Sequence, residues 1–123
     1  MLFNNHKRKK KINKNVGKIG YCDGSTLGLP IGHYVYIRSI KNGKADVNTF
    51  TSLETYSHKY KKDKLNYVKN GNIYPIPITD TNLKLFSGVD NRIIKNVDVS
   101  LIKNKNSYYI KSRHKHYINR YVK

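Results

Sequence analysis

The segment with the most concentrated chemistry is residues 111–117, KSRHKHY, which combines basic, imidazole and aromatic side chains. Lysine and arginine contact phosphates, and a tyrosine face can stack an unpaired base for about 1–3 kcal/mol. Tyr108, Tyr109 and Tyr121 lie close to it in the chain. The segment therefore predicts a nucleic-acid contact. The residues expected to make it are Lys111, Arg113, His114, Lys115, Tyr117 and Arg120.

The two neighbouring histidines of this segment are the best metal candidates in the sequence. His114 and His116 would point to the same face of a strand. Lys111, Arg113 and Lys115 would repel a cation there, and a zinc site needs three or four convergent ligands. We therefore expect neither a metal nor a cofactor.

No familiar catalytic motif is present. The sequence lacks a Walker loop, a His-Glu-x-x-His pair and a nucleophile elbow, and its 7 acids are too few for a two-metal nuclease. A metal-free cut remains open for RNA, because the 2′-hydroxyl is an internal nucleophile that needs only acid-base help and charge stabilisation. Any nuclease activity should therefore act on RNA.

The charge of the chain is strongly and unevenly positive. The sequence has 25 Lys and Arg against 7 Asp and Glu, a net charge of +18, and residues 1–18 and 99–123 contain no acid. Clustered basic charge of this kind predicts a nucleic-acid partner, RNA ahead of DNA. The N-terminal residues expected to contact it are Lys7, Arg8, Lys9, Lys10 and Lys11. We expect residues 1–18 to form a flexible basic arm and residues 19–123 to form one domain.

The remaining composition predicts a cytoplasmic protein without a membrane partner. Cys22 is the single cysteine, so no internal disulfide can form. No apolar run approaches the roughly 18 residues of a membrane span, and the basic N-terminal region does not resemble a secretory signal.

The clearest structural signal is a β-hairpin. Residues 33–40 are rich in aromatic and β-branched residues, Asn42-Gly43 is the favoured pair for a type I′ turn, and residues 45–52 return. A short strand is also expected at residues 18–22, and a loop or short irregular helix at residues 53–64.

A second hairpin is predicted from residues 65–68, Asn70-Gly71 and residues 73–78. Pro75 and Pro77 place its return strand at a sheet edge, since proline cannot donate to a ladder.

Five further segments complete the prediction. Residues 83–89 and 92–102 are apolar-rich, residues 103–106 form a turn, and residues 107–111 and 117–122 are short strands. Six or seven short strands with frequent turns predict a mainly β protein folded as a small antiparallel barrel.

Several short motifs resemble the PemK/MazF toxin family. They are residues 30–37 (PIGHYVYI), a hairpin ending in Thr51-Ser52, residues 71–78, and residues 83–98 (LKLFSGVDNRIIKNVD). Together they cover about residues 28–102. The resemblance implies an SH3-like β-barrel, a homodimer, an acidic antitoxin-like partner and metal-free cleavage of single-stranded RNA.

The resemblance also implies site residues. Thr51 and Ser52 match the family's active-site Thr-Ser, but Gly32-His33 stands where the family has its catalytic Arg. His33 or Arg38 would have to replace that Arg. Two other functions stay open. One is a non-catalytic DNA- or RNA-binding protein, either a regulatory or accessory protein of a mobile element or a ribosome-associated factor. The other is an interaction module for an acidic protein.

Overall fold

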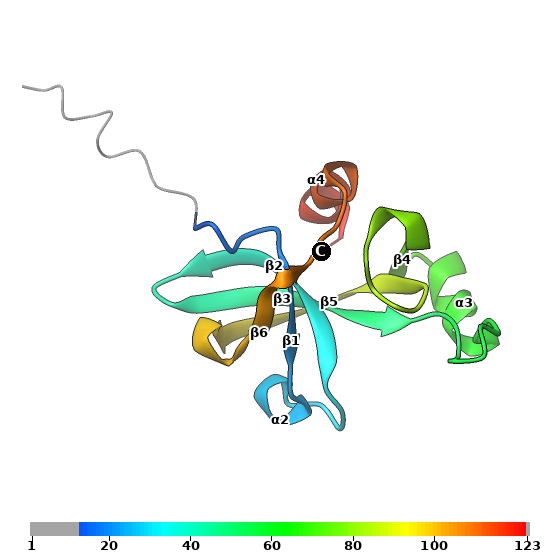
Figure 1. Cartoon of the computed structure of the whole chain (residues 1–123), viewed down its shortest axis with the longest axis horizontal. Helices are drawn as coiled ribbons and strands as arrows, with labels where there is room; N and C mark the ends of the chain where they lie inside the picture. Colours follow the sequence, from blue (N-terminus) through cyan, green and yellow to red (C-terminus); the bar gives the residue numbers. More distant parts are fainter. Residues whose placement is uncertain (1–12, 123) are drawn as a thin grey trace, which may run out of the picture.

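The computed structural model describes residues 13–122, which form one antiparallel sheet and a few short helices (Figure 1). The strands are β1 (Ile19–Cys22), β2 (His33–Lys41), β3 (Lys44–Ser52), β4 (Ile73–Ile76), β5 (Ser87–Asp98) and β6 (Lys103–Tyr108). The helices are α2 (Gly24–Leu27), α3 (Lys62–Lys69), α4 (Ser112–Tyr121) and the 3₁₀ turns η1 (Ile78–Asp80) and η2 (Val99–Leu101). The mainly β prediction is confirmed.

The sheet is open rather than a closed barrel. Its order is β4-β5-β3-β2-β1-β6, so β4 and β6 are its two edges. A single isolated bridge, Thr81 to Ile110, joins the segments that follow these edges. The predicted barrel therefore describes the sheet only loosely, because the sheet does not close. β4 is four residues long and includes Pro75, which cannot donate a ladder hydrogen bond.

The first predicted hairpin is confirmed as β2 and β3. Asn42 and Gly43 both have positive φ, 53° and 75°, as a type I′ turn requires. Figure 1 places this turn at one end of the long axis of the molecule and α3 at the other. The long β3–β5 ladder connects the two ends, and its last pairs are Thr51 with Gly88 and Ser52 with Ser87.

The core has two parts. One lies between the sheet and α4, where Ile118 and Val122 pack with Tyr36 and Phe50. The other lies under β2, β3 and β5, where Val35, Ile37 and Val47 pack against Leu27 and Ile102 from α2 and the segment after η2.

Two predicted strands are helices. Residues 117–121 belong to α4, where the buried residues His114 and Ile118 are four positions apart, the spacing of one helix face, and the buried Val122 follows four positions later as the C-cap. Residues 65–68 belong to α3, so the second hairpin is wrong, although β4 is an edge strand as predicted. Residues 103–106, expected to form a turn, begin β6.

The predicted basic arm is described only in part. Residues 1–12, which include Lys7, Arg8, Lys9, Lys10 and Lys11, lie outside the described residues. From Gly17 the chain is joined to the sheet, since its N–H donates to Ile37 O at 2.8 Å. Among residues 13–122, no helix has the length and hydropathy needed to cross a bilayer.

Candidate nucleic-acid interface

The β2–β3 cleft is a hollow of about 460 Å³ at the end of the hairpin away from its turn. His33, Thr51 and Ser52, three of the residues predicted from the sequence, line it together. Lys61, Lys64 and Lys84 also line it, as do the rings of Tyr21, Tyr34 and Tyr56. None of the described residues that line this cleft is Asp or Glu.

The hairpin register explains why these residues meet. Val35 pairs with Thr49, so continuing the same antiparallel register places His33 opposite Thr51. His33 Nδ1 lies 2.9 Å from the carbonyl oxygen of Phe50. A carbonyl only accepts, so Nδ1 carries the proton, and in the neutral imidazole the lone pair remains on Nε2. His33 therefore has a fixed tautomer with its basic nitrogen at Nε2.

Lys61 brings a positive charge to the serine of the cleft. Its ammonium donates to Ser52 Oγ at 2.8 Å, and its backbone N–H donates to Leu53 O at 2.9 Å. The loop before it is anchored by Glu54, whose buried carboxylate accepts from Phe86 N at 2.7 Å. That bond holds the pKa of Glu54 below its usual range. The loop that carries Lys61 and Tyr56 is therefore anchored at its start. The Tyr56 side chain is 86% exposed.

Two tyrosines form a neutral wall of the cleft. Tyr21 and Tyr34 meet edge to face with centroids 5.3 Å apart, and Tyr34 packs likewise on Tyr108 at 4.9 Å. The hydrogen bond between the Tyr34 and Tyr108 hydroxyls, together with burial, raises the pKa of Tyr34 to about 12. Gly32 makes room for the wall, because a Cβ there would lie 2.0 Å from the Tyr21 hydroxyl oxygen.

Arg38, the other predicted candidate, does not line this cleft. Its guanidinium donates to Asn48 Oδ1 at 2.8 Å and to the carbonyl oxygens of Ile118 at 3.2 Å and Val122 at 2.5 Å. The last carbonyls of a helix lack partners within the helix, and Arg38 supplies one to Val122 O at the C-cap of α4 and a second one to Ile118 O, which also accepts from Val122 N.

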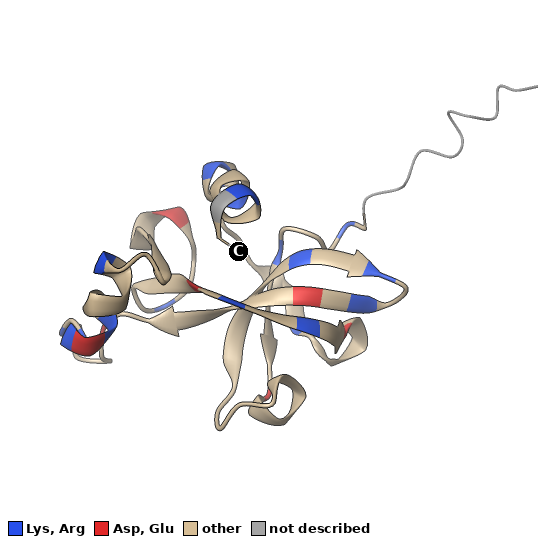
Figure 2. Ribbon diagram, turned by 180° about the vertical axis from the view of Figure 1, so that it is seen from behind, with Lys and Arg blue, Asp and Glu red and all other residues tan. Residues whose placement is uncertain are grey.

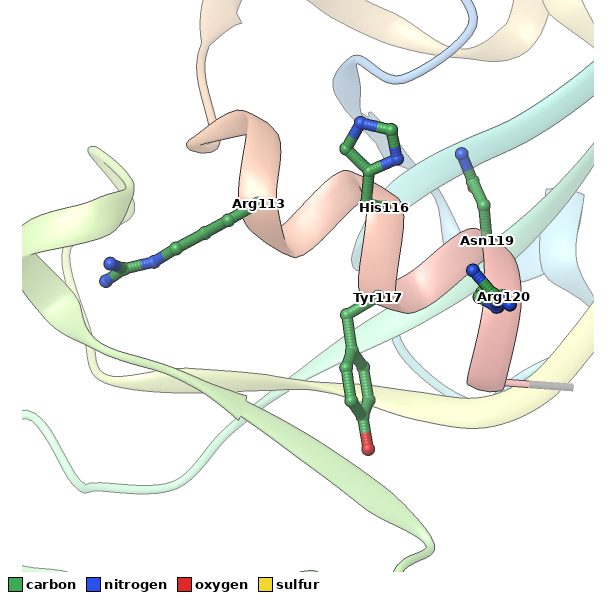
Figure 3. A pocket seen from close by; sticks show the side chains of 5 residues that line it. All are labelled: Arg113, His116, Tyr117, Asn119 and Arg120. Atoms are coloured by element: carbon green, nitrogen blue, oxygen red, sulfur yellow. The ribbon is translucent and has the colours of Figure 1, made fainter.

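The second predicted contact region is the exposed face of α4. Figure 3 shows the side chains around a hollow of about 530 Å³ on this helix. Arg113 projects near the start of the helix, Tyr117 projects to one side of it, and His116 and Asn119 project together to the other. Arg120 completes the lining near the end of the helix. Figure 2 shows that both α3 and α4 carry basic residues.

His114 has a different place from its basic neighbours. It is buried, its Nδ1 lies 2.7 Å from the Tyr74 hydroxyl, and its Nε2 lies 2.6 Å from Asp80 Oδ2. Asp80 also accepts from Lys111 and Arg113, and these contacts hold its pKa well below the usual range. The network ties the start of α4 to β4 and η1. Lys115 lies over Gly17, away from the α4 hollow.

Sequence reasoning missed the lysines of the β2–β3 cleft. Lys61 and Lys64 belong to a segment of mixed charge, and Lys84 follows in a separate loop. Neither residue alternation nor residue spacing predicts that these lysines share a cleft with Ser52, because the folding of the loops decides their positions. No sequence pattern identifies Asp80 as the partner of the basic segment, residues 111–117.

Within residues 13–122, no three His, Cys, Asp or Glu side chains are grouped as a metal site would require. Comparison with protein-family models, curated proteins and solved structures finds no match to the chain.

Proposed function

We propose that this protein binds single-stranded RNA in the β2–β3 cleft. One observation carries the proposal: the cleft gathers Lys61, Lys64 and Lys84 beside three tyrosine rings, and none of its described lining residues is an acid. Lysines neutralise phosphates, and tyrosine faces stack bases that are free of a pairing partner. This combination favours a single strand over a duplex, whose bases are already stacked.

RNA is favoured over DNA by polar groups that line the same cleft as the lysines and the rings. His33, Thr51 and Ser52 supply an imidazole nitrogen and two hydroxyls within one hollow. The ribose 2′-hydroxyl both donates and accepts, so these groups can distinguish it from deoxyribose.

A second candidate function is metal-independent cleavage of the bound RNA. The Nδ1–H of His33 donates to Phe50 O, so Nε2 is the nitrogen that can accept a proton. In this reaction Nε2 removes the 2′-hydroxyl proton and the 2′-oxygen attacks the adjacent phosphorus. The bond to the 5′-oxygen breaks, and that oxygen takes a proton from a lysine ammonium or water. The products are a 2′,3′-cyclic phosphate and a 5′-hydroxyl, and Lys61 would stabilise the developing charge.

The test uses a labelled RNA of about 12 nucleotides, the DNA of the same sequence, an RNA duplex and heparin. Fluorescence anisotropy is measured over a salt series on the full chain. We expect the single-stranded RNA to bind more tightly than the duplex and heparin at physiological salt. Equal affinity for heparin would overturn the proposal.

Two variants, one within the cleft and one outside it, locate the binding site. K61A/K64A/K84A removes three cleft charges, whereas K41A/K95A removes exposed lysines that line none of the four hollows in this region. We expect the first variant to reduce the salt slope by about 2, at 0.7 per phosphate contact, and the second to change it little. Incubation with EDTA and a denaturing gel then tests cleavage.

A further inference from the structure

The β2–β3 cleft is the first of four hollows that are linked in series by shared lining residues. Lys64 lines the cleft and also a hollow of about 430 Å³ over α3, β4 and β5. That hollow shares Asn72, Ile73 and Asn91 with a smaller one of about 230 Å³. Tyr117 lines this smaller hollow and the α4 hollow. Because each neighbouring pair has residues in common, the four hollows lie next to one another in series, and this series is the path referred to below.

Cations line three of the four hollows of the path, and the smaller hollow of about 230 Å³ has no charged lining residue. Lys61, Lys64 and Lys84 lie at its beginning, Arg92 near its middle and two arginines at its end on α4. Among the described residues that line the four hollows, Asp90 is the single acid, and it lies 3.8 Å from the guanidinium of Arg92. An anionic chain would therefore meet cations at intervals and no unpaired acid among these residues.

Aromatic rings also recur along the path. Tyr56 stands at the rim of the cleft, Tyr67 is 48% exposed in the middle, and Tyr117 is 43% exposed on α4. Tyr117 stacks on Tyr74 with centroids 4.3 Å apart and planes 14° from parallel. A ring held in this way keeps its orientation, which lowers the entropy cost of stacking a base on its other face. Alternating cations and aromatic rings are the pattern of a surface that follows a single strand.

The far end of the path is held in place by buried contacts. Asp80 binds Lys111, Arg113 and His114, and His114 binds Tyr74, so the start of α4 is fixed to β4 and η1. Arg38 fixes the other end of the helix. The spacing between the cleft and the α4 hollow is therefore set by the fold.

We propose that one RNA strand occupies this whole path, from the β2–β3 cleft across β4 and β5 to the exposed face of α4. This inference rests on the proposed RNA-binding function and adds its direction and extent. The series of four hollows and the cations that line three of them favour a polyanion of several nucleotides over a mononucleotide, whose single phosphate would fill one hollow.

The experiment is an oligouridylate length series from about 4 to about 16 nucleotides, the range of single-strand sites on small β domains. On the parent protein, affinity should rise with length and then level off once the strand reaches α4. The variant R113Q/R120Q should reduce the ratio of long-RNA to short-RNA affinity toward one. For the long RNA its salt slope should fall by about 1.4, because two phosphate contacts are lost.

A second variant guards against a folding defect. R92Q/R120Q leaves the contacts of Arg113 with Asp80 in place and should lower the same ratio, whereas K41A/K95A should leave it at the parent value. Thermal unfolding of each variant is recorded in parallel. A ratio unchanged in both arginine variants would overturn the path while leaving RNA binding in the cleft intact. Failure of the parent protein to bind RNA of any length would overturn the proposed function itself.

The two ends of the strand provide an independent measurement. A long oligonucleotide with 5-iodouridine at one end is crosslinked by light, and the modified tyrosine is identified by mass spectrometry. We expect crosslinks at Tyr56 from one end and at Tyr117 from the other. Crosslinks from both ends at Tyr56 would overturn the path.

Discussion

His114 donates through Nε2 to the Asp80 carboxylate at 2.6 Å, and both side chains are buried. The two residues are 34 positions apart in the chain and belong to α4 and η1. A buried carboxylate is stable only when hydrogen bonds and cations compensate for its lost hydration. Here the predicted phosphate-binding segment supplies that compensation, so part of its positive charge holds the fold together.

The first prediction concerns stability in acid. The contacts of Asp80 lower its pKa, so they stabilise the folded state above the ordinary carboxylate pKa of about 3.9. That contribution is lost as the pH falls below this value toward the lower pKa of the folded state. D80N should therefore be less stable than the parent at pH 7, and the difference should narrow in acid. Urea unfolding at a series of pH values measures it.

The control for this series is D63N, which removes an exposed acid in the first turn of α3. It changes the net charge by the same amount without touching the buried network. If D63N and D80N showed the same pH dependence, general charge repulsion would explain the effect and Asp80 would have no special role.

The second prediction separates two roles of Arg38. Because its guanidinium binds the last carbonyls of α4, R38A should lower the free energy of unfolding by about 1.5–3 kcal/mol, the usual range for hydrogen bonds to a charged group. RNA binding to the β2–β3 cleft should persist where the variant is folded. Chemical unfolding and anisotropy on the same sample measure both quantities. Parent-like stability combined with lost RNA cleavage would show instead that Arg38 acts on RNA.

The sequence predicted the elements whose signals are local. The β2–β3 hairpin was predicted because Asn42-Gly43 has a strong turn preference, and the positive φ values of both residues agree. α4 was missed because its tyrosines and isoleucine favour a strand by composition, whereas the spacing of His114, Ile118 and Val122 is helical.

The residues of the candidate site differ in the same way: local patterns predict some of them, and contacts between separate segments decide the others. Thr51 and His33 meet because a hairpin register brings them opposite each other, and a register can be read from a turn. Lys61 reaches Ser52 because the loop between them turns back on itself, with Glu54 bridged to Tyr60 and bound to Phe86 N. No short sequence pattern encodes that contact. Asp80 was likewise invisible, since its partners lie more than 30 positions further along the chain.

The third prediction concerns the tyrosine wall of the cleft. A Cβ at Gly32 would lie 2.0 Å from the Tyr21 hydroxyl oxygen and 2.9 Å from the carbonyl oxygen of Cys22. G32A should therefore displace the Tyr21 ring and weaken RNA binding in the cleft. In a Y21A background the same substitution should cost less, because the ring is gone and the backbone contact remains. A double-mutant cycle on RNA affinity measures this coupling, and strictly additive effects would contradict the predicted clash.

The last prediction tests whether His33 is the general base of the proposed cleavage. H33N keeps a side-chain N–H close to the position of Nδ1, so it can still donate to Phe50 O, but it has no basic nitrogen in place of Nε2. RNA affinity should stay close to that of the parent, while single-turnover cleavage should fall by about 10²–10⁴-fold, the usual contribution of general base catalysis. H33A, which loses both the donor and the base, should also weaken binding. Anisotropy gives the affinity, and a gel that resolves the 2′,3′-cyclic phosphate product gives the rate. Cleavage by H33N at the parent rate would remove His33 from the reaction, whereas an uncut RNA with every variant and with the parent would leave binding as the function of the cleft.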